Sequence, residues 1–166
     1  MLRPGLLYFA YGCNMDPGFL AELIGRPLEH GWAVRADGWR LAFNKGGEGE
    51  YGGSVVANLI PDERCQTLGV VYRLPHEALA SLDAFEGIPD HYRRETLWVE
   101  PLGRRARQAA VAYIAQPRWI VEAARPDPAY LNLLLRGARI HGLPLEYLNW
   151  VHRLASGTAR EPWQVE

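Results

Sequence analysis

The feature that most constrains the fold is a short apolar run near the start of the chain, Leu6 to Tyr11, which stops at Gly12. Its residues are all apolar or aromatic and do not alternate with polar ones, which is typical of a strand buried on both faces. Such a strand has to lie inside a layered or closed sheet. The chain has 166 residues, of which 48% are hydrophobic, so it can bury a sizeable core.

The strand and helix patterns that follow do not alternate strictly. Asp16 before Pro17 is typical of a helix start, and Gly25 stands where that helix ends. The later patterns predict strands at Trp32–Val34, Trp39–Phe43, Val55–Ile60 (ended by Pro61), Leu68–Leu74, Tyr92–Glu100 and Gln108–Ala115, a Gly/Glu-rich loop at Gly46–Gly53, and helices from Pro75 to Gly87, from Asp127 to Gly142 and at Leu145–Leu154. This order predicts an α+β fold with a mostly antiparallel or barrel-like sheet.

Length and charge exclude several classes of protein. The length favours one domain, which we expect over residues 1–157, with a C-terminal tail at 158–166. The formal net charge of −1 does not favour binding to nucleic acid, and no apolar run is long enough to span a membrane. The first residues do not resemble a signal peptide, so a cytoplasmic location is expected.

Cysteine and histidine spacing does not predict a metal or redox site. The two cysteines, Cys13 and Cys65, form no C-x-x-C pair. The five histidines lie far apart, without ligand spacing such as H-x-x-x-H. We therefore expect no bound metal.

The segment Tyr11-Gly12-Cys13-Asn14 is the first candidate site. A glycine at the end of a strand lets the backbone approach a ligand, and the helix that follows offers N–H groups and a partial positive charge. These features suit a carboxylate or a developing oxyanion. On spacing alone, however, a plain strand-to-helix turn is the more common case.

Glu86 is the second candidate, because it ends a short helix just before Gly87. The negative end of the helix dipole and the apolar neighbours Phe85 and Ile88 both disfavour the ionised carboxylate. The pKa of Glu86 should therefore rise toward the range that serves proton transfer near neutral pH. Position alone would equally allow a solvated glutamate at a helix end.

Two further side chains, Asp83 and Cys13, could take part in catalysis. Asp83 stands three residues before Glu86 and could supply a second carboxylate, but we interpret it as a surface or capping residue. Cys13, near a helix N-terminus, could have a lowered pKa and act as a nucleophile. No histidine spacing supplies it with a base, so a small buried thiol is the favoured interpretation.

Several motifs, in order from about residue 8 to residue 150, resemble the γ-glutamylcyclotransferase family. Tyr8 to Met15 (YFAYGCNM) resembles the Y-G-S-N signature that opens these proteins. The other matching segments are Gly52–Ala57 (GGSVVA), Gly69–Tyr72 (GVVY), Leu82–Gly87 (LDAFEG), Tyr92–Arg94 (YRR), Pro128–Tyr130 (PAY) and Gly142–Tyr147 (GLPLEY). The last segment favours this branch over the glutathione-specific branch.

The resemblance implies a mixed, mostly antiparallel β-barrel flanked by helices, with the opening loop at one end. It implies an enzyme without metal or organic cofactor that acts on a small γ-glutamyl substrate. In that reaction the substrate's own α-amine attacks its γ-carbonyl, giving 5-oxoproline and a free amino acid or amine. A homodimer is compatible with the sequence, although no feature decides the oligomeric state.

The resemblance also implies roles for individual residues. Glu86 would accept the proton of the α-amine and pass one to the leaving amine. The backbone N–H groups of Gly12, Cys13 and Asn14 would bind either the oxyanion or the substrate's α-carboxylate. The tyrosines that resemble pocket-lining positions of the family are Tyr11, Tyr92, Tyr113 and Tyr130. Cys13 departs from the family, which usually has serine there.

Three alternatives to a small γ-glutamyl amine or amino acid as substrate stay open. The first is removal of a γ-glutamyl group from a larger or carrier-bound amide. The second is a non-catalytic binding module of the same fold, against which the presence of Glu86 argues. The third is an acyl transferase that uses Cys13 as its nucleophile.

Overall fold

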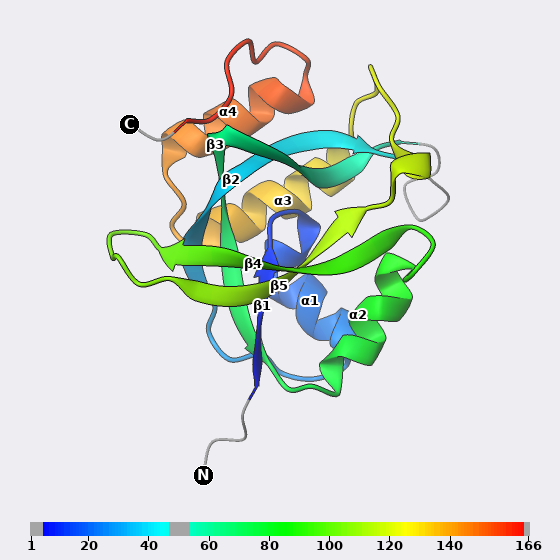
Figure 1. Ribbon diagram of the computed structural model, residues 1–166, viewed down its shortest axis with the longest axis vertical. Helices are drawn as coiled ribbons and strands as arrows, with labels where there is room; N and C mark the ends of the chain where they lie inside the picture. The colour runs from blue at the N-terminus through cyan, green and yellow to red at the C-terminus, as the bar shows by residue number, and fades with distance from the viewer. Residues whose placement is uncertain (1–4, 47–53, 165–166) are drawn as a thin grey trace.

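A closed barrel of five strands is the centre of the part of the chain that the computed structural model describes, residues 5–46 and 54–164 (Figure 1). The strands are β1 (Leu6–Ala10), β2 (Trp32–Lys45), β3 (Val56–Leu74), β4 (Tyr92–Pro101) and β5 (Gln108–Ala115). The helices are α1 (Pro17–Ile24), α2 (Ala78–Glu86), α3 (Pro128–Ile140) and α4 (Leu145–Ala155), with 3₁₀ turns η1 (Cys13–Met15) and η2 (Pro117–Trp119).

The barrel closes through β1, in the order β1-β3-β2-β4-β5. β1 pairs antiparallel with β3 on one side and parallel with β5 on the other, where Tyr8 lies opposite Val111. The remaining pairs are antiparallel. The mixed, mostly antiparallel barrel flanked by helices confirms the expected α+β class.

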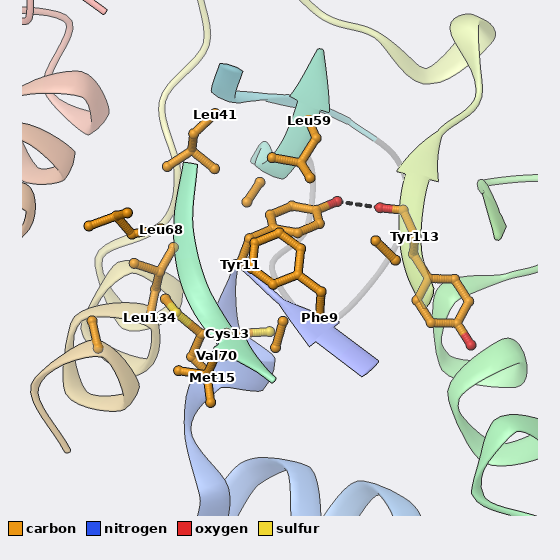
Figure 2. Close-up of a cluster of buried hydrophobic side chains, with 14 of the residues drawn as sticks. Phe9, Tyr11, Cys13, Met15, Leu41, Leu59, Leu68, Val70, Tyr113 and Leu134 are labelled. Atoms are coloured by element: carbon orange, nitrogen blue, oxygen red, sulfur yellow. Dashed lines mark hydrogen bonds between the residues drawn. The ribbon is translucent and has the colours of Figure 1, made fainter. Parts of the chain in front are cut away.

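The apolar run that forms β1 is buried as its pattern predicts. Tyr8, Phe9 and Ala10 are almost fully enclosed. Figure 2 shows Phe9 packed beside Tyr11 in a cluster that takes side chains from β1, β2, β3 and α3. A strand with neighbours on both edges and side chains enclosed on both faces has no solvent-facing position, so it contains no alternating polar residues.

Two pairs of predicted strands are in fact single long strands. Trp32–Val34 and Trp39–Phe43 both belong to β2, and Val55–Ile60 and Leu68–Leu74 fall within β3 apart from Val55. The prediction that Pro61 ends a strand was wrong. Pro61 pairs with Trp39 of β2, at the point where the β2–β3 register shifts. The other neighbour of β3, β1, pairs with β3 only from Val70 to Leu74. Pro61 therefore lacks no hydrogen bond to β1, although it has no backbone N–H.

Most predicted helix ends are confirmed, but α2 begins at Ala78 and not at Pro75, and α3 ends at Ile140, two residues before Gly142. Asp16 caps α1, where its Oδ1 accepts a hydrogen bond from the Phe19 N–H at 2.9 Å, and Asp127 caps α3 by accepting from the Ala129 N–H at 2.8 Å. Gly25 ends α1, and Gly87 ends α2 with a φ of 65°, a left-handed conformation that favours glycine. The predicted loop Gly46–Gly53 lies outside the described residues except for Gly46.

The helices cover the barrel from different sides (Figure 1). α1 and α2 lie next to each other, joined by an edge contact between Phe19 and Phe85. α4 covers the middle of β3, where the Tyr147 hydroxyl donates to the Leu68 carbonyl at 3.1 Å. Trp163, within the expected tail, packs its ring against Tyr147 and Trp150, so this part of the chain contributes to the fold.

α3 packs against η1, the turn that follows β1. Its Gly137 lies directly on the Met15–Asp16 backbone, so closely that a methyl group at position 137 would overlap the backbone atoms. The Arg136 guanidinium donates to the buried Asp16 carboxylate at 2.5 Å, and the Tyr72 hydroxyl donates to the Met15 carbonyl at 2.7 Å. These contacts fix the turn from three directions.

We expect Gly137→Ala to lower the free energy of unfolding by roughly 1–3 kcal/mol, because the added methyl group overpacks the interface between α3 and η1. A decrease in stability would be informative, because replacing glycine by alanine inside a helix otherwise raises the stability of the helix. Chemical denaturation measures the effect, with Asn132→Ala on the exposed face of α3 as the control. Unchanged or increased stability of Gly137→Ala would contradict the close packing.

Candidate functional site

A cavity of about 330 Å³ lies between the end of β1 and the end of α2. All the residues that the sequence singled out for the site line it: Tyr11, Gly12, Cys13, Asn14, Glu86, Tyr92, Tyr113 and Tyr130. They come from the segment after β1, from α2, β4, β5 and α3. Segments far apart in the sequence therefore meet around one cavity. Its volume suits a small ligand, since small-molecule sites occupy roughly 300–1,000 Å³.

Glu86 is held over this cavity by the turn at Gly87. Burial raises the pKa of its carboxyl from 4.5 to about 8, and the nearby Lys45 ammonium partly offsets this rise. The predicted rise of the Glu86 pKa is supported. Its main cause is desolvation of the carboxyl by burial in a cavity lined by tyrosines. Phe85, expected to shield the carboxyl, is 43% exposed and turns to Phe19 instead.

Asn14 connects the turn after β1 to Glu86. Its side-chain amide donates to the Tyr8 hydroxyl at 2.9 Å and lies 3.4 Å from Glu86 Oε1. Cys13, Asn14 and Met15 form one buried 3₁₀ turn. The amide thus places a hydrogen-bond donor beside the carboxyl at the end of the cavity.

The N-terminus of α1 faces a carboxylate of the chain itself. Asp16 occupies it, and the Arg136 guanidinium holds the pKa of Asp16 below its usual value, so the carboxylate stays ionised. The residues of the preceding turn, Gly12 to Asn14, line the cavity.

Tyr130 and Tyr92 both bind Ala57 at the start of β3. The Tyr130 hydroxyl accepts from the Ala57 N–H at 3.0 Å, and the Tyr92 hydroxyl donates to the Ala57 carbonyl at 3.0 Å. A side chain at Gly12 would collide with the Tyr130 hydroxyl, so glycine is needed here for close approach. Burial raises the pKa of both tyrosines, which remain protonated at neutral pH.

Tyr11 and Tyr113 lie at the opposite wall. The Tyr11 hydroxyl donates to the Tyr113 carbonyl, while the Tyr113 ring points away from Tyr11 (Figure 2). The Tyr113 hydroxyl donates to Asp83 at 2.8 Å, and Arg94 lies 3.4 Å from the same carboxylate. Asp83 thus supports Tyr113 and does not line the cavity with Glu86.

Cys13 lies in the cavity wall and is buried. Its Sγ is 3.8 Å from Asn14 Oδ1. In Figure 2 its side chain lies among Val70 and Met15 in the hydrophobic cluster. These contacts are those of a small buried thiol, the interpretation that the sequence favoured.

The sequence did not assign to the site six further residues that line the cavity: Tyr8, Lys45, Val56, Ala57, Ala84 and His91. Lys45 is the only lysine of the chain and is 6% exposed. Its Nζ donates to the Gly46 carbonyl at 2.5 Å and lies 3.0 Å from His91 Nδ1, and burial lowers its pKa. The one feature of the sequence that could have singled out Lys45 is that it is the only lysine in a chain otherwise rich in arginine.

Within residues 5–46 and 54–164, no three His, Cys, Asp or Glu side chains are arranged to hold a metal ion. No helix in the same ranges is long and apolar enough to cross a bilayer.

Comparisons with known proteins agree with this fold. The human and mouse proteins named "Gamma-glutamylcyclotransferase" are each 29% identical to this chain over 150 residues, covering 85% of it and 74% of the relative. A solved structure named "Gamma-glutamyl cyclotransferase" has a TM-score of 0.76 at 23% identity, over 89% of this chain and 86% of that one. That structural likeness establishes the shared barrel.

The closed barrel with its flanking helices is the γ-glutamylcyclotransferase-like α+β fold. The model of the AIG2-like family matches residues 66–151, more than half of the chain. The chain belongs to the AIG2-like family, within the γ-glutamylcyclotransferase-like superfamily.

The raised pKa of Glu86 predicts a stability cost at alkaline pH. Below the usual pKa of 4.5 both folded and unfolded states are protonated, and above about 8 the buried carboxyl must ionise. Between these values folding loses up to ~1.4 kcal/mol for each pH unit. Glu86→Gln should therefore be as stable as wild type near pH 4 and more stable near pH 9.

Thermal unfolding of both proteins across this pH range measures the difference. Glu95→Gln, at a half-exposed carboxylate on β4, is the matched control. A stability difference between Glu86→Gln and wild type that stays constant from pH 4 to pH 9 would contradict the raised pKa.

Proposed function

We propose that this protein is a γ-glutamylcyclotransferase, with Glu86 as its proton-transfer residue and no metal or organic cofactor. It converts a γ-glutamyl amino acid or amine to 5-oxoproline and the free amino acid or amine. The observation that carries the proposal is a carboxyl with a pKa of about 8 in a small cavity, beside the Gly12–Asn14 turn. The names of the human and mouse relatives support the same activity.

The reaction needs a base for the substrate's ammonium group. Only the neutral α-amine attacks, so the ammonium first releases one proton to solvent. Glu86 accepts a second proton from the same nitrogen as the new carbon–nitrogen bond closes the five-membered ring. The resulting tetrahedral intermediate collapses when the old amide bond breaks. Glu86 then returns the proton to the departing nitrogen, so the carboxylate is regenerated and the protons balance.

The turn from Gly12 to Asn14 supplies donors for the charge that develops. Its hydrogen-bond donors face the same cavity as Glu86, and in the low-dielectric surroundings of buried tyrosines they act strongly on an oxyanion or a carboxylate. Tyr92 and Tyr130, both fixed to Ala57, form rigid walls. Such walls hold a flexible γ-glutamyl chain in the curled shape that brings amine and carbonyl together.

The size of the cavity favours a small substrate over a carrier-bound one. At about 330 Å³ it lies at the lower end of small-molecule sites, roughly 300–1,000 Å³. Removal of γ-glutamyl from a larger amide remains the second candidate, because the cavity is open to solvent at one side. A non-catalytic binding module is the third.

Glu86→Gln should lower kcat by ~10²-fold or more, because glutamine is similar in size but accepts no proton. Release of 5-oxoproline from a panel of γ-glutamyl amino acids and amines measures the effect. Cys13→Ser is the matched control at the same cavity, since it restores the residue usual in the family. Loss of activity in Cys13→Ser alone would point to the cysteine as nucleophile, and no release from any substrate by the folded protein would support the binding module.

The pH dependence of kcat/KM gives an independent check on Glu86. The base must be ionised in the free enzyme, and its pKa is about 8, so kcat/KM should rise with pH up to about 8. Steady-state rates from pH 5 to pH 9 measure this. A plateau reached near pH 5 would mean that the ionising base is an ordinary, solvated carboxylate.

A further inference from the structure

We propose that Tyr72 is a positioning residue for proton transfer by Glu86, because its hydroxyl fixes the turn that carries Asn14. Tyr72 belongs to β3 and does not line the cavity. The inference rests on the function proposed above and names a residue that acts on Glu86 only through its neighbours. It starts from a buried hydroxyl of the barrel that binds the backbone of the turn η1.

Tyr8 and Tyr72 hold two adjacent residues of this turn. They stand opposite each other in the antiparallel β1–β3 pair, so their side chains lie on the same face of the sheet. The Tyr8 hydroxyl accepts a hydrogen bond from the Asn14 side-chain amide at 2.9 Å. The Tyr72 hydroxyl donates to the Met15 carbonyl at 2.7 Å. One strand pair therefore fixes both the side chain of Asn14 and the backbone that follows it.

The Tyr72 side chain is itself held by α3. It is 1% exposed, and its ring meets the His141 ring edge-on, with centroids 5.5 Å apart and planes at 90°. The Tyr72 hydroxyl lies 3.2 Å from His141 Nε2. His141 Nδ1 donates to the Gly137 carbonyl at 2.7 Å, since a carbonyl can only accept. Because Gly137 packs on the backbone of η1, Tyr72 is tied both to the turn and to the helix that covers it.

The geometry of the turn depends on this hydroxyl. Burial raises the pKa of Tyr72, so the hydroxyl keeps its proton at neutral pH and can donate to Met15. Met15 is completely buried. Without the hydroxyl, the Met15 carbonyl would lose a hydrogen bond where water does not replace it, and that loss destabilises the arrangement around it. The turn would then shift toward another partner.

A shift of the turn would reach Glu86 through Asn14. The Asn14 Nδ2 lies 3.4 Å from Glu86 Oε1. At that length the contact has little slack, because a separation of about 3.6 Å is no longer a hydrogen bond. A donor beside a carboxyl favours its ionised form, which is the form that accepts the proton of the amine. Tyr72 therefore influences both the rate and the pH at which Glu86 works.

Tyr72→Phe removes only the hydroxyl, and Tyr147→Phe is its matched control. Tyr147 is also 1% exposed, and its hydroxyl donates to the Leu68 carbonyl at 3.1 Å, away from the cavity lining. Both variants should lose similar stability in chemical denaturation. Only Tyr72→Phe should lower kcat/KM for release of 5-oxoproline, by ~10-fold, whereas Tyr147→Phe should stay within ~2-fold of wild type. Equal effects on kcat/KM in the two variants would overturn the proposal.

The pH dependence of kcat/KM separates positioning from a structural role. With the Asn14 donor displaced, the rise of kcat/KM should move to higher pH by about 0.5 units in Tyr72→Phe and stay in place in Tyr147→Phe. A structural role would lower the rate by one factor at every pH, and that result would refute the proposal. Neither substitution alters the titratable side chains around Glu86, which include Tyr8, Tyr11, Lys45, Tyr92, Tyr113 and Tyr130.

An NMR titration separates this proposal from the activity. If no substrate releases 5-oxoproline, the proposed function fails. The titration midpoint of the Glu86 carboxyl carbon should still lie about 0.5 pH units higher in Tyr72→Phe than in wild type and in Tyr147→Phe. The same midpoint in all three proteins would show that Tyr72 does not act on Glu86.

Hydrogen exchange examines the turn itself and includes a measurement on wild type alone. The N–H groups of Met15 and Asp16 donate to the carbonyls of Gly12 and Cys13, both at 3.1 Å. In wild type these two amides should exchange as slowly as those of the barrel strands, and Tyr72→Phe should accelerate them ~10-fold. Exchange in wild type at the rate of an exposed loop would contradict the proposal even if Tyr72→Phe does not fold.

Discussion

The arrangement of the site depends on the close packing of α3 against the turn that follows β1. Gly137 allows the two backbones to touch, and Arg136 anchors the buried Asp16 carboxylate. With the turn fixed, Asn14 is directed at Tyr8 and Glu86. A helix near the end of the chain therefore positions residues near its beginning, and the barrel supplies the rigid frame between them.

Two buried ionisable side chains, Glu86 and Lys45, determine the chemical properties of the cavity. Burial raises the pKa of Glu86 and lowers that of Lys45, so both shifts favour the neutral form of the group. Each group also favours the charged form of the other. The cavity thus holds a carboxyl that exchanges its proton near neutral pH beside a buried cation, and both are typical of sites selected for function at some cost in stability.

Local signals in the sequence predicted local structure well. The caps at Asp16 and Asp127 and the left-handed stop at Gly87 depend on neighbouring residues only, and all three stand where expected. The split of β2 and of β3 into separate strands was wrong, because Pro61 is a strand breaker only where its missing N–H would face a partner. Whether β3 has a second neighbouring strand at Pro61 depends on the length of β1, which pairs with β3 only from Val70 to Leu74.

What the sequence by itself determined was the α+β class, the buried first strand, the ends of the helices and, through resemblance to a family, a list of residues that line one cavity. What only the tertiary structure decided was the chemistry of that cavity. Lys45 and His91 are 46 positions apart, and Asn14 and Glu86 are 72 apart. Their proximity, the desolvation of Glu86 and the burial of Lys45 arise when the barrel closes and its helices cover it, because pKa values depend on distance and burial, and neither is encoded in the spacing of residues along the chain.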